Sequence, residues 1–202
     1  MTRRAALAAW VLVAAGCPHA KPCLFVGDAK AAPEAVLIVT DGIKTVDVQA
    51  GDAVPLLRPP QGGQVTYAAA RVRNMSTCNV QMRGRFRDPM SGAELAFDGR
   101  TADLTVGADG WARPDTSALS EFANIAPCPD YDPTRDIVDT PATLEVTVID
   151  GDKRTVTVSQ PVVPRCTQAD AQAQALCQCE CSKLPSGTMH MCNNGVLDAG
   201  TR

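Results

Sequence analysis

The chain has 202 residues, of which 45% are hydrophobic, 4% aromatic and 20% charged. This length suits one globular domain with short appendages, and the hydrophobic share is too high for a wholly disordered chain. The formal charge of -3 excludes broad electrostatic capture of a nucleic acid, so we expect no nucleic-acid partner. Nine cysteines favour an oxidising compartment over the reducing cytosol.

The first residues have the layout of a secretory signal. Arg3 and Arg4 precede an apolar run over residues 5–16. A helix that spans a bilayer needs about 20 apolar residues, so this run is too short to be a stable membrane span. The pattern predicts a signal peptide at residues 1–16, and therefore export.

Residues 13–17, Val-Ala-Ala-Gly-Cys, resemble the lipobox of bacterial lipoproteins, in which small residues precede a cysteine that becomes the lipidated first residue. Ala14 departs from the leucine most usual at its position. The resemblance implies a diacylglycerol thioether and an acylated amine on Cys17, which would anchor the protein in the bacterial cell envelope, at the outer membrane or cell surface rather than the inner membrane. The alternative is an ordinary signal peptide that leaves Cys17 as a thiol. Parity favours lipidation, because removing Cys17 from nine cysteines leaves an even number for disulfides.

The mature chain divides into three parts. Residues 17–34 are rich in Pro, Ala and Lys without periodicity, which predicts a lipidated tether, although Cys23 could staple part of it down. Residues 35–164 contain short alternating apolar segments, which predict strands. Residues 165–202 form a cysteine-rich tail. Asp-Gly pairs typical of hairpin turns occur at Asp41-Gly42, Asp98-Gly99, Asp109-Gly110 and Asp150-Gly151.

The strand segments indicate an all-β fold, an antiparallel sandwich or barrel. Residues 144–149 and 155–163, with the segment 79–88, resemble bacterial immunoglobulin-like modules, so the expectation is an immunoglobulin-like sandwich with a disulfide-rich tail containing one helix. Trp111 lies beside a turn and does not match the core tryptophan of that family. A short helix is expected at 117–124, between two strands.

The tail begins with a predicted helix at Thr167–Cys177. Thr167 and Asp170 have the spacing of a capping box, and apolar residues follow at helical spacing. A helix of this length would place Cys166 and Cys177 about 16 Å apart, so they should not be disulfide partners.

The remaining cysteines are expected to form disulfides. Cys177, Cys179 and Cys181 are awkward partners for one another, so each should pair outside this triplet. If Cys78 and Cys128 pair with each other, the triplet must pair with the three cysteines that remain. These are Cys23, Cys166 and Cys192, and a bond to Cys23 would join the tail to the tether. The candidates for the triplet's partners are Cys23, Cys78, Cys128, Cys166 and Cys192.

A metal site is the alternative for the tail. The triplet, with His190 and Cys192, could supply soft ligands for zinc or copper(I). Its spacing matches no familiar zinc pattern, and export favours oxidation. We therefore expect disulfides, with no metal and no cofactor.

Alternating arginines provide a candidate contact surface for an anionic or acidic partner, such as an envelope polysaccharide or an envelope protein. Two of these arginines alternate over residues 71–73 and three over residues 83–87. If these segments are neighbouring antiparallel strands, all five guanidinium groups would line one surface. The alternative is an ordinary solvated sheet face, neutralised by Asp130, Asp132, Asp136 and Asp139. The arginines are Arg71, Arg73, Arg83, Arg85 and Arg87.

No motif indicates catalysis. The acidic segment 130–139 could wrap a calcium ion, but it lacks the glycine and terminal glutamate of an EF-hand loop. A hydrolase using two aspartates is a further alternative. The sequence favours a non-catalytic, lipid-anchored envelope protein with a structural or partner-binding role.

Overall fold

The computed structural model describes residues 23–128, 136–182, 192–193 and 196–197. Strands account for 51% of these residues, and α1 (Ala171–Glu180) is the one α-helix among them. The mostly β composition and the antiparallel sheets confirm the expected fold class at this level. Cys17, the signal peptide and His190 lie outside the described residues.

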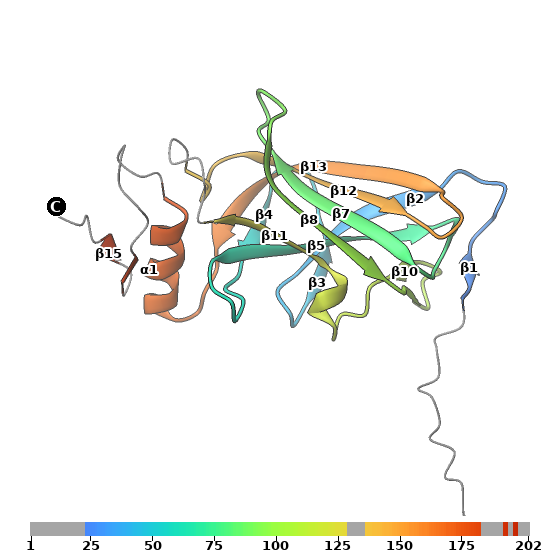
Figure 1. The fold of residues 1–202 in the computed structure, drawn as a ribbon, viewed down its shortest axis with the longest axis horizontal. Coiled ribbons are helices and arrows are strands. Elements are labelled where there is room, and N and C mark those ends of the chain that lie inside the picture. The colour runs from blue at the N-terminus through green and yellow to red at the C-terminus, as the bar shows by residue number, and fades with distance from the viewer. Residues whose placement is uncertain (1–22, 129–135, 183–191, 194–195, 198–202) are drawn as a thin grey trace, which may run out of the picture.

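Two sheets form the body (Figure 1). The first sheet has the order β3 (Thr45–Asp47), β2 (Glu34–Thr40), β5 (Gln64–Arg73), β10 (Ala112–Arg113) and β9 (Thr105–Val106), with β11 (Ala123–Cys128) also paired to β5. The second sheet has the order β4 (Asp52–Leu56), β13 (Thr155–Cys166), β12 (Ala142–Ile149), β7 (Val80–Arg87) and β8 (Glu94–Ala102). Neighbouring strands are antiparallel except β4 and β13, which are parallel.

Two short ladders lie outside these sheets. β1 (Phe25–Val26) pairs with β6 (Met75–Ser76), and β14 (Cys192–Asn193) pairs with β15 (Val196–Leu197). β1 belongs to the range assigned to the tether, so the chain is already held on the body from its first described residues.

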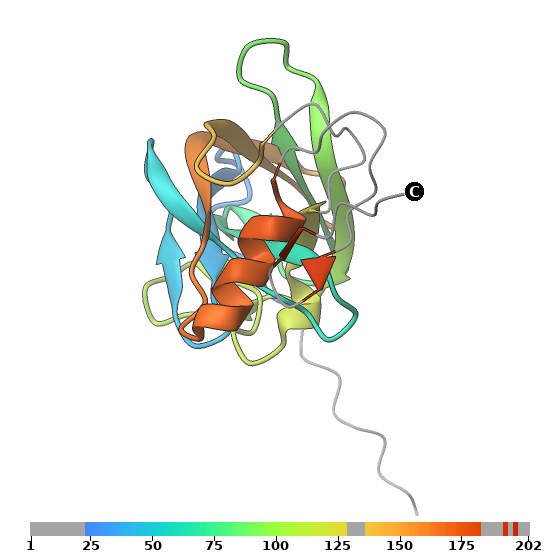
Figure 2. The same cartoon turned by 90° about the vertical axis from the view of Figure 1, so that its left-hand side faces the viewer.

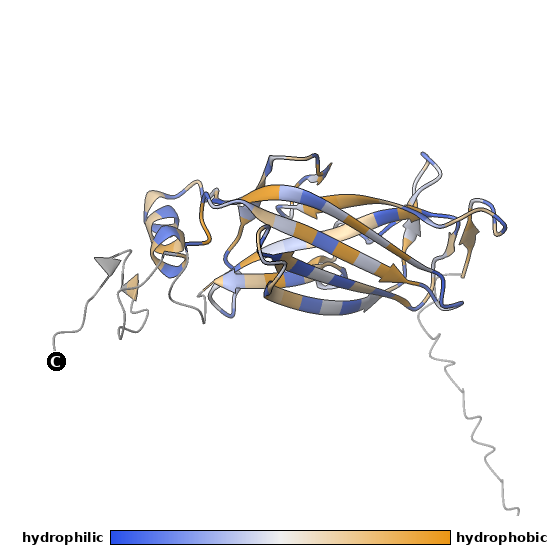
Figure 3. Cartoon of the chain, turned by 90° about the horizontal axis from the view of Figure 1, so that it is seen from above, coloured by the Kyte–Doolittle hydropathy of each residue, from blue (hydrophilic) through white to orange (hydrophobic). Residues whose placement is uncertain are grey.

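The core lies between the two sheets and draws on both. In β12 the buried side chains of Leu144, Val146 and Val148 alternate with partly exposed ones, and Figure 3 shows the matching alternation of apolar and polar residues along the strands. Such alternation buries one face of a sheet and leaves the other in water. At Gly84 the sheets approach so closely that a Cβ atom would lie 2.7 Å from Cδ1 of Ile125.

The Asp-Gly prediction holds at two turns and fails at Asp98-Gly99. Gly42 and Gly110 occupy turns with φ of 88° and 74°. Asp98 and Gly99 instead lie inside β8, where Asp98 faces Gly84 of β7. The β12–β13 turn contains Asp150-Gly151, but its left-handed residue is Lys153. The side chain of Asp150 shapes this turn by accepting hydrogen bonds from the backbone of residues 76, 152 and 154.

The predicted helix at 117–124 is reduced to a single 3-10 turn, η1 (Leu119–Glu121). Phe122 is already extended, and Ala123 begins β11. Both side chains are fully buried, so tertiary packing overrides the local helical pattern.

β1 and the C-terminal helix lie at opposite ends of the body. β1 is at one end of the long axis and α1 is at the other, and Figure 2 looks onto the α1 end. The expectation that the tail and the tether form one stapled unit is therefore wrong. Among the described helices, none is long and apolar enough to cross a membrane.

Candidate functional site

The described cysteines form four disulfides. These are Cys23–Cys78, Cys128–Cys181, Cys166–Cys177 and Cys179–Cys192. The expected disulfide chemistry is confirmed, and each member of the triplet pairs outside it.

Two expectations about the pairing are wrong. Cys166 and Cys177, which the predicted helix excluded as partners, are bonded, with Cα atoms 5.9 Å apart, because α1 begins at Ala171 and not at Thr167. Asp170 is the N-cap residue, and its carboxylate accepts a hydrogen bond from the backbone N–H of Ala173 at 2.8 Å. Residues between β13 and this cap turn the chain back, so the two cysteines meet.

The second wrong expectation is the pairing of Cys78 with Cys128. Cys78 follows β6 at the β1 end of the body, where it bonds Cys23. Cys128 ends β11 near α1, where it bonds Cys181. The two cysteines belong to opposite ends of the molecule because Cys128 pairs with Gln64 at the start of β5, whereas Cys78 follows the end of β5, after β6.

We call residues 166–182 and 192–193 the C-terminal unit. The helix of this unit, α1, has almost no apolar face of its own. It packs over a small second core that is separate from the core between the two sheets. Disulfide sulfur supplies much of the apolar contact there. This second core consists of Leu56, Cys128, Ile137, Cys177 and Cys181.

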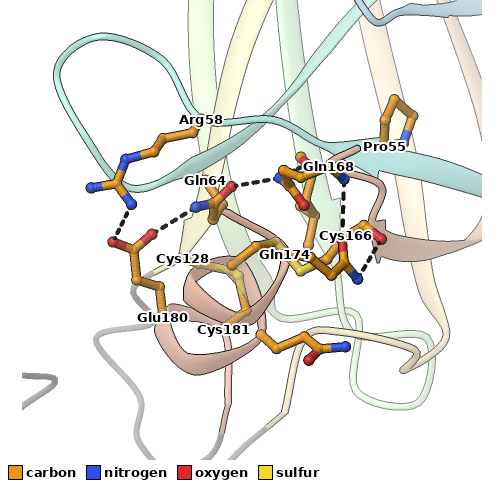
Figure 4. The surroundings of a disulfide bond; sticks show 12 residues. Pro55, Arg58, Gln64, Cys128, Cys166, Gln168, Gln174, Glu180 and Cys181 are labelled. Carbon is orange, nitrogen blue, oxygen red and sulfur yellow. Dashed lines mark hydrogen bonds and ion pairs between the residues drawn. A yellow bond between two sulfur atoms is a disulfide. The ribbon is translucent and has the colours of Figure 1, made fainter. Parts of the chain in front are cut away.

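A polar network beside the Cys128–Cys181 disulfide docks the C-terminal unit on the body (Figure 4). Glu180 accepts hydrogen bonds from Nη1 of Arg58 at 3.0 Å and Nε2 of Gln64 at 2.7 Å. Gln168 donates to the backbone oxygen of Leu56 at 2.8 Å and to Oε1 of Gln64 at 3.2 Å. Gln64 is fully buried, so losing these partners would leave buried polar atoms unpaired.

Three sulfurs of the C-terminal unit lie together. The Sγ atoms of Cys166, Cys177 and Cys181 are within 4.8 Å of one another, which differs from the ligand set suggested by the sequence. A metal is bound by thiolate, and these sulfurs are all engaged in disulfides. Metal binding at this cluster would therefore require reduction first.

The five candidate arginines do not line one surface. Arg71 and Arg73 lie on β5 in the first sheet, whereas Arg83, Arg85 and Arg87 lie on β7 in the second. The chain changes sheets between these strands, passing through β6, so they are not hairpin neighbours. The expectation of five guanidinium groups on one face is wrong.

Most of these arginines have acidic partners, but not the predicted aspartates. Arg71 pairs with Asp47 at 2.7 Å, and this hydrogen-bonded contact raises the pKa of the Arg71 guanidinium. Arg73 pairs with Glu34 at 2.6 Å. On the second sheet, Glu145 contacts Arg85 at 3.1 Å and Arg87 at 3.5 Å. Of the aspartates named as neutralising partners, Asp139 instead pairs with Arg165 at 2.9 Å, and Asp130 and Asp132 lie outside the described residues.

Arg83 differs from its neighbours. Its cross-strand partners are Thr147 of β12 and Gly99 of β8, neither of which is acidic. Its side chain is exposed, and within the described ranges no ion pair involves it. Arg83 is therefore the member of the set best placed to meet an external anion.

Trp111, which is partly exposed, makes a contact that the sequence does not predict. The guanidinium carbons of Arg71 and Arg73 lie 4.5 and 4.9 Å from its ring centroid, a cation–π arrangement. The contact arises because Ala112 of β10 pairs with Val72 of β5. A pairing between segments so far apart has no local signal in the sequence.

A hollow of about 480 Å³ lies between the β2–β3 turn, β4 and residues 167–169. Asp41 is the carboxyl group among its lining residues. Hydrogen bonds from the backbone N–H groups of Lys44 and Ile43 lower the pKa of Asp41, so this group is ionised at neutral pH. A two-carboxylate hydrolase would need a second acidic group that is held protonated, and this lining contains none.

Comparisons with protein-family models, curated proteins and solved structures give no match for this chain.

Proposed function

We propose that the chain is an exported, lipid-anchored and non-catalytic protein of the bacterial cell envelope, with an immunoglobulin-like β-sandwich as its body. The observation that carries this proposal is the cysteine pairing. Eight of the nine cysteines form disulfides with one another, which leaves Cys17 outside the set. Disulfides on this scale fit an oxidising compartment, and Cys17 stands where the lipobox resemblance puts the lipidated residue.

The sandwich part of the proposal has its own support. Two mainly antiparallel sheets enclose the core, and hairpins connect β7 to β8 and β12 to β13. These features are shared by immunoglobulin-like modules. The parallel pairing of β4 with β13 and the absence of a core tryptophan among the described residues set this chain apart from antibody domains.

Metabolic labelling with radioactive palmitate tests the anchor. We expect the wild-type chain to incorporate label in a bacterial host that processes lipoproteins, and the Cys17→Ser variant to incorporate none. The matched control is Cys23→Ser, which removes a nearby cysteine and should keep the label. Equal labelling of the two variants, or an unlabelled wild-type chain, would rule the anchor out.

We propose that Arg83 is the residue that binds an anionic partner. An exposed guanidinium without an acidic partner is free to pair with a carboxylate or phosphate. We expect Arg83→Ser to weaken retention on immobilised polygalacturonate, with neutral dextran as the reference matrix. The control is Arg73→Ser, since Arg73 is already neutralised by Glu34. If both variants are retained like wild type, the outer face of β7 is an ordinary solvated surface.

A further inference from the structure

The body begins with two exposed apolar side chains. Leu24 is 49% exposed and Phe25 39% exposed, directly after Cys23. Large apolar side chains that stand together on the surface mark a contact site more often than scattered single ones do. We call residues 23–32, with the β12–β13 turn at 150–154, the anchor end.

These two side chains are held in place on the body. The Cys23–Cys78 disulfide fixes the residue before them, and the backbone N–H of Leu24 donates to Oγ1 of Thr77 at 3.0 Å. Phe25 pairs with Ser76 in the β1–β6 ladder. The backbone is therefore too constrained for Leu24 and Phe25 to turn inward onto the core.

The anchor end is further braced by Arg154. Its guanidinium donates to the backbone oxygens of Ala29 and Ala31 and lies 5.5 Å from the ring centroid of Phe25. At Gly27, φ is +87° and a Cβ atom would collide with the side chain of Asn74. These contacts hold residues 23–32 in a fixed orientation relative to the body.

The chain length fixes what this surface can meet. If Cys17 carries lipid, as proposed above, only residues 18–22 separate it from Cys23. Six Cα-to-Cα steps reach about 20 Å when fully extended. The anchor end must therefore stay close to the lipid headgroups, and the exposed apolar pair lies directly at the point of attachment.

We propose that the anchor end rests on the lipid surface, with Leu24 and Phe25 inserted at the membrane interface. The transfer of aromatic and aliphatic side chains from water to the edge of the acyl region has a favourable free energy. The inference rests on the proposed lipidation of Cys17. It adds an orientation, in which β1 faces the membrane and the C-terminal unit points away from it.

The charges at the anchor end favour apolar insertion over attraction to anionic lipids. Within residues 23–32 and 150–154 the basic and acidic residues are equal in number, so this surface has no net charge to attract anionic headgroups. Contact should therefore depend little on the fraction of anionic lipid. The basic residues are Lys30, Lys153 and Arg154, and the acidic residues are Asp28, Asp150 and Asp152.

Tryptophan fluorescence in vesicles of brominated phosphatidylcholine tests this orientation. Trp111→Phe provides the background, since Trp10 is removed with the predicted signal peptide. The reporter is Phe25→Trp, and the control is Ile43→Trp. Ile43 is 96% exposed in the β2–β3 turn, at the far end of β2 from the anchor end. We expect strong quenching for Phe25→Trp in the acylated full-length protein and almost none for Ile43→Trp.

Flotation of the vesicles separates the two proposals. If the protein floats with the vesicles and Phe25→Trp emission is unquenched, the orientation is wrong although the anchor holds. If the protein does not float, the proposed lipid anchor itself fails. Quenching that appears only with anionic lipid would contradict the apolar mode. Leu24→Trp is a second reporter should Phe25→Trp fail to fold, and the same quenching is expected of it.

Discussion

The body and the C-terminal unit are stabilised by different means. The body encloses a continuous apolar core between two sheets, including Phe86 and Leu144, which are almost completely buried. The C-terminal unit has only a small second core, and three of the four disulfides involve it. Cross-links and a buried polar network thus replace apolar area where the chain has little of it. The comparison predicts that the two regions can be destabilised separately.

The largest expected effect is in the body. Phe86→Ala should lower the free energy of unfolding by about 3 to 5 kcal/mol, because it opens a cavity in a packed core. Urea denaturation followed by circular dichroism measures this loss. The control is Phe97→Ala, because Phe97 is 51% exposed on β8 and its truncation should cost less than about 1 kcal/mol. Similar losses for both variants would mean that the core between the sheets is not what stabilises the body.

The next effect is in the C-terminal unit. Replacing both Cys128 and Cys181 with Ser should cost about 2 to 4 kcal/mol, and the loss should be local to this unit. Hydrogen exchange should speed up in α1 while β12 remains protected. Both cysteines must be replaced, because a lone Cys181 thiol would lie within 4.8 Å of the Cys166–Cys177 sulfurs and could exchange with them.

Replacing both Cys166 and Cys177 with Ser sharpens this comparison. This disulfide closes a sequence separation of 11, against 53 for Cys128–Cys181. Loop-closure entropy then predicts a loss smaller by about 1.4 kcal/mol. Loss of protection in β12 with either double variant would show that the body depends on the C-terminal unit.

A smaller effect is expected from the polar network. Glu180→Gln places an amide where two donors, from Arg58 and Gln64, converge on a carboxylate. The side chain of Glu180 is only 14% exposed, so we expect a loss of about 1 kcal/mol in thermal or urea unfolding. Glu94→Gln is the control, because Glu94 is 46% exposed and lies 3.5 Å from Arg85. An equal, near-zero effect of both would mean that the network does not help dock α1.

The smallest effect concerns a single turn. Asp41 has a lowered pKa in the folded protein, so its contribution to stability is complete above its unfolded value of 3.8 and is lost as pH falls through the lower folded value. Asp41→Asn keeps an oxygen that can accept from Ile43 and Lys44 but removes the titration. The melting temperature of the variant should therefore lie slightly below that of wild type at neutral pH and fall less in this acidic range, so that the two values converge. An identical acid dependence would contradict this assignment.

The sequence predicts those features that depend on local spacing. Alternation identified β12, the Asp41-Gly42 and Asp109-Gly110 turns were correct, and the parity of the cysteines matched a disulfide framework. Each of these depends on residues close together in the chain. The presence of a helix in the tail was also correct, although its N-cap is Asp170 and not Thr167.

The errors come from features that depend on distant pairing or on a small shift. A helix start displaced from Thr167 to Ala171 was enough to reverse the conclusion about Cys166 and Cys177. The surface of five arginines failed because β5 and β7 enter different sheets, which their alternation does not reveal. The docking of Glu180 on Gln64 joins residues 116 apart, and the sequence contains no sign of it.

Intact-mass analysis of the chain extracted from membranes tests whether Cys17 is lipidated and the other cysteines are disulfide-bonded. We expect a protein that begins at residue 17 and carries the added mass of a diacylglycerol and an acyl group. Alkylation without reduction should add nothing, and alkylation after reduction should add eight groups, one for each disulfide cysteine. A chain that retains residues 1–16 would show that Cys17 is not lipidated, and one that reacts with the alkylating agent before reduction would show that the disulfides are incomplete.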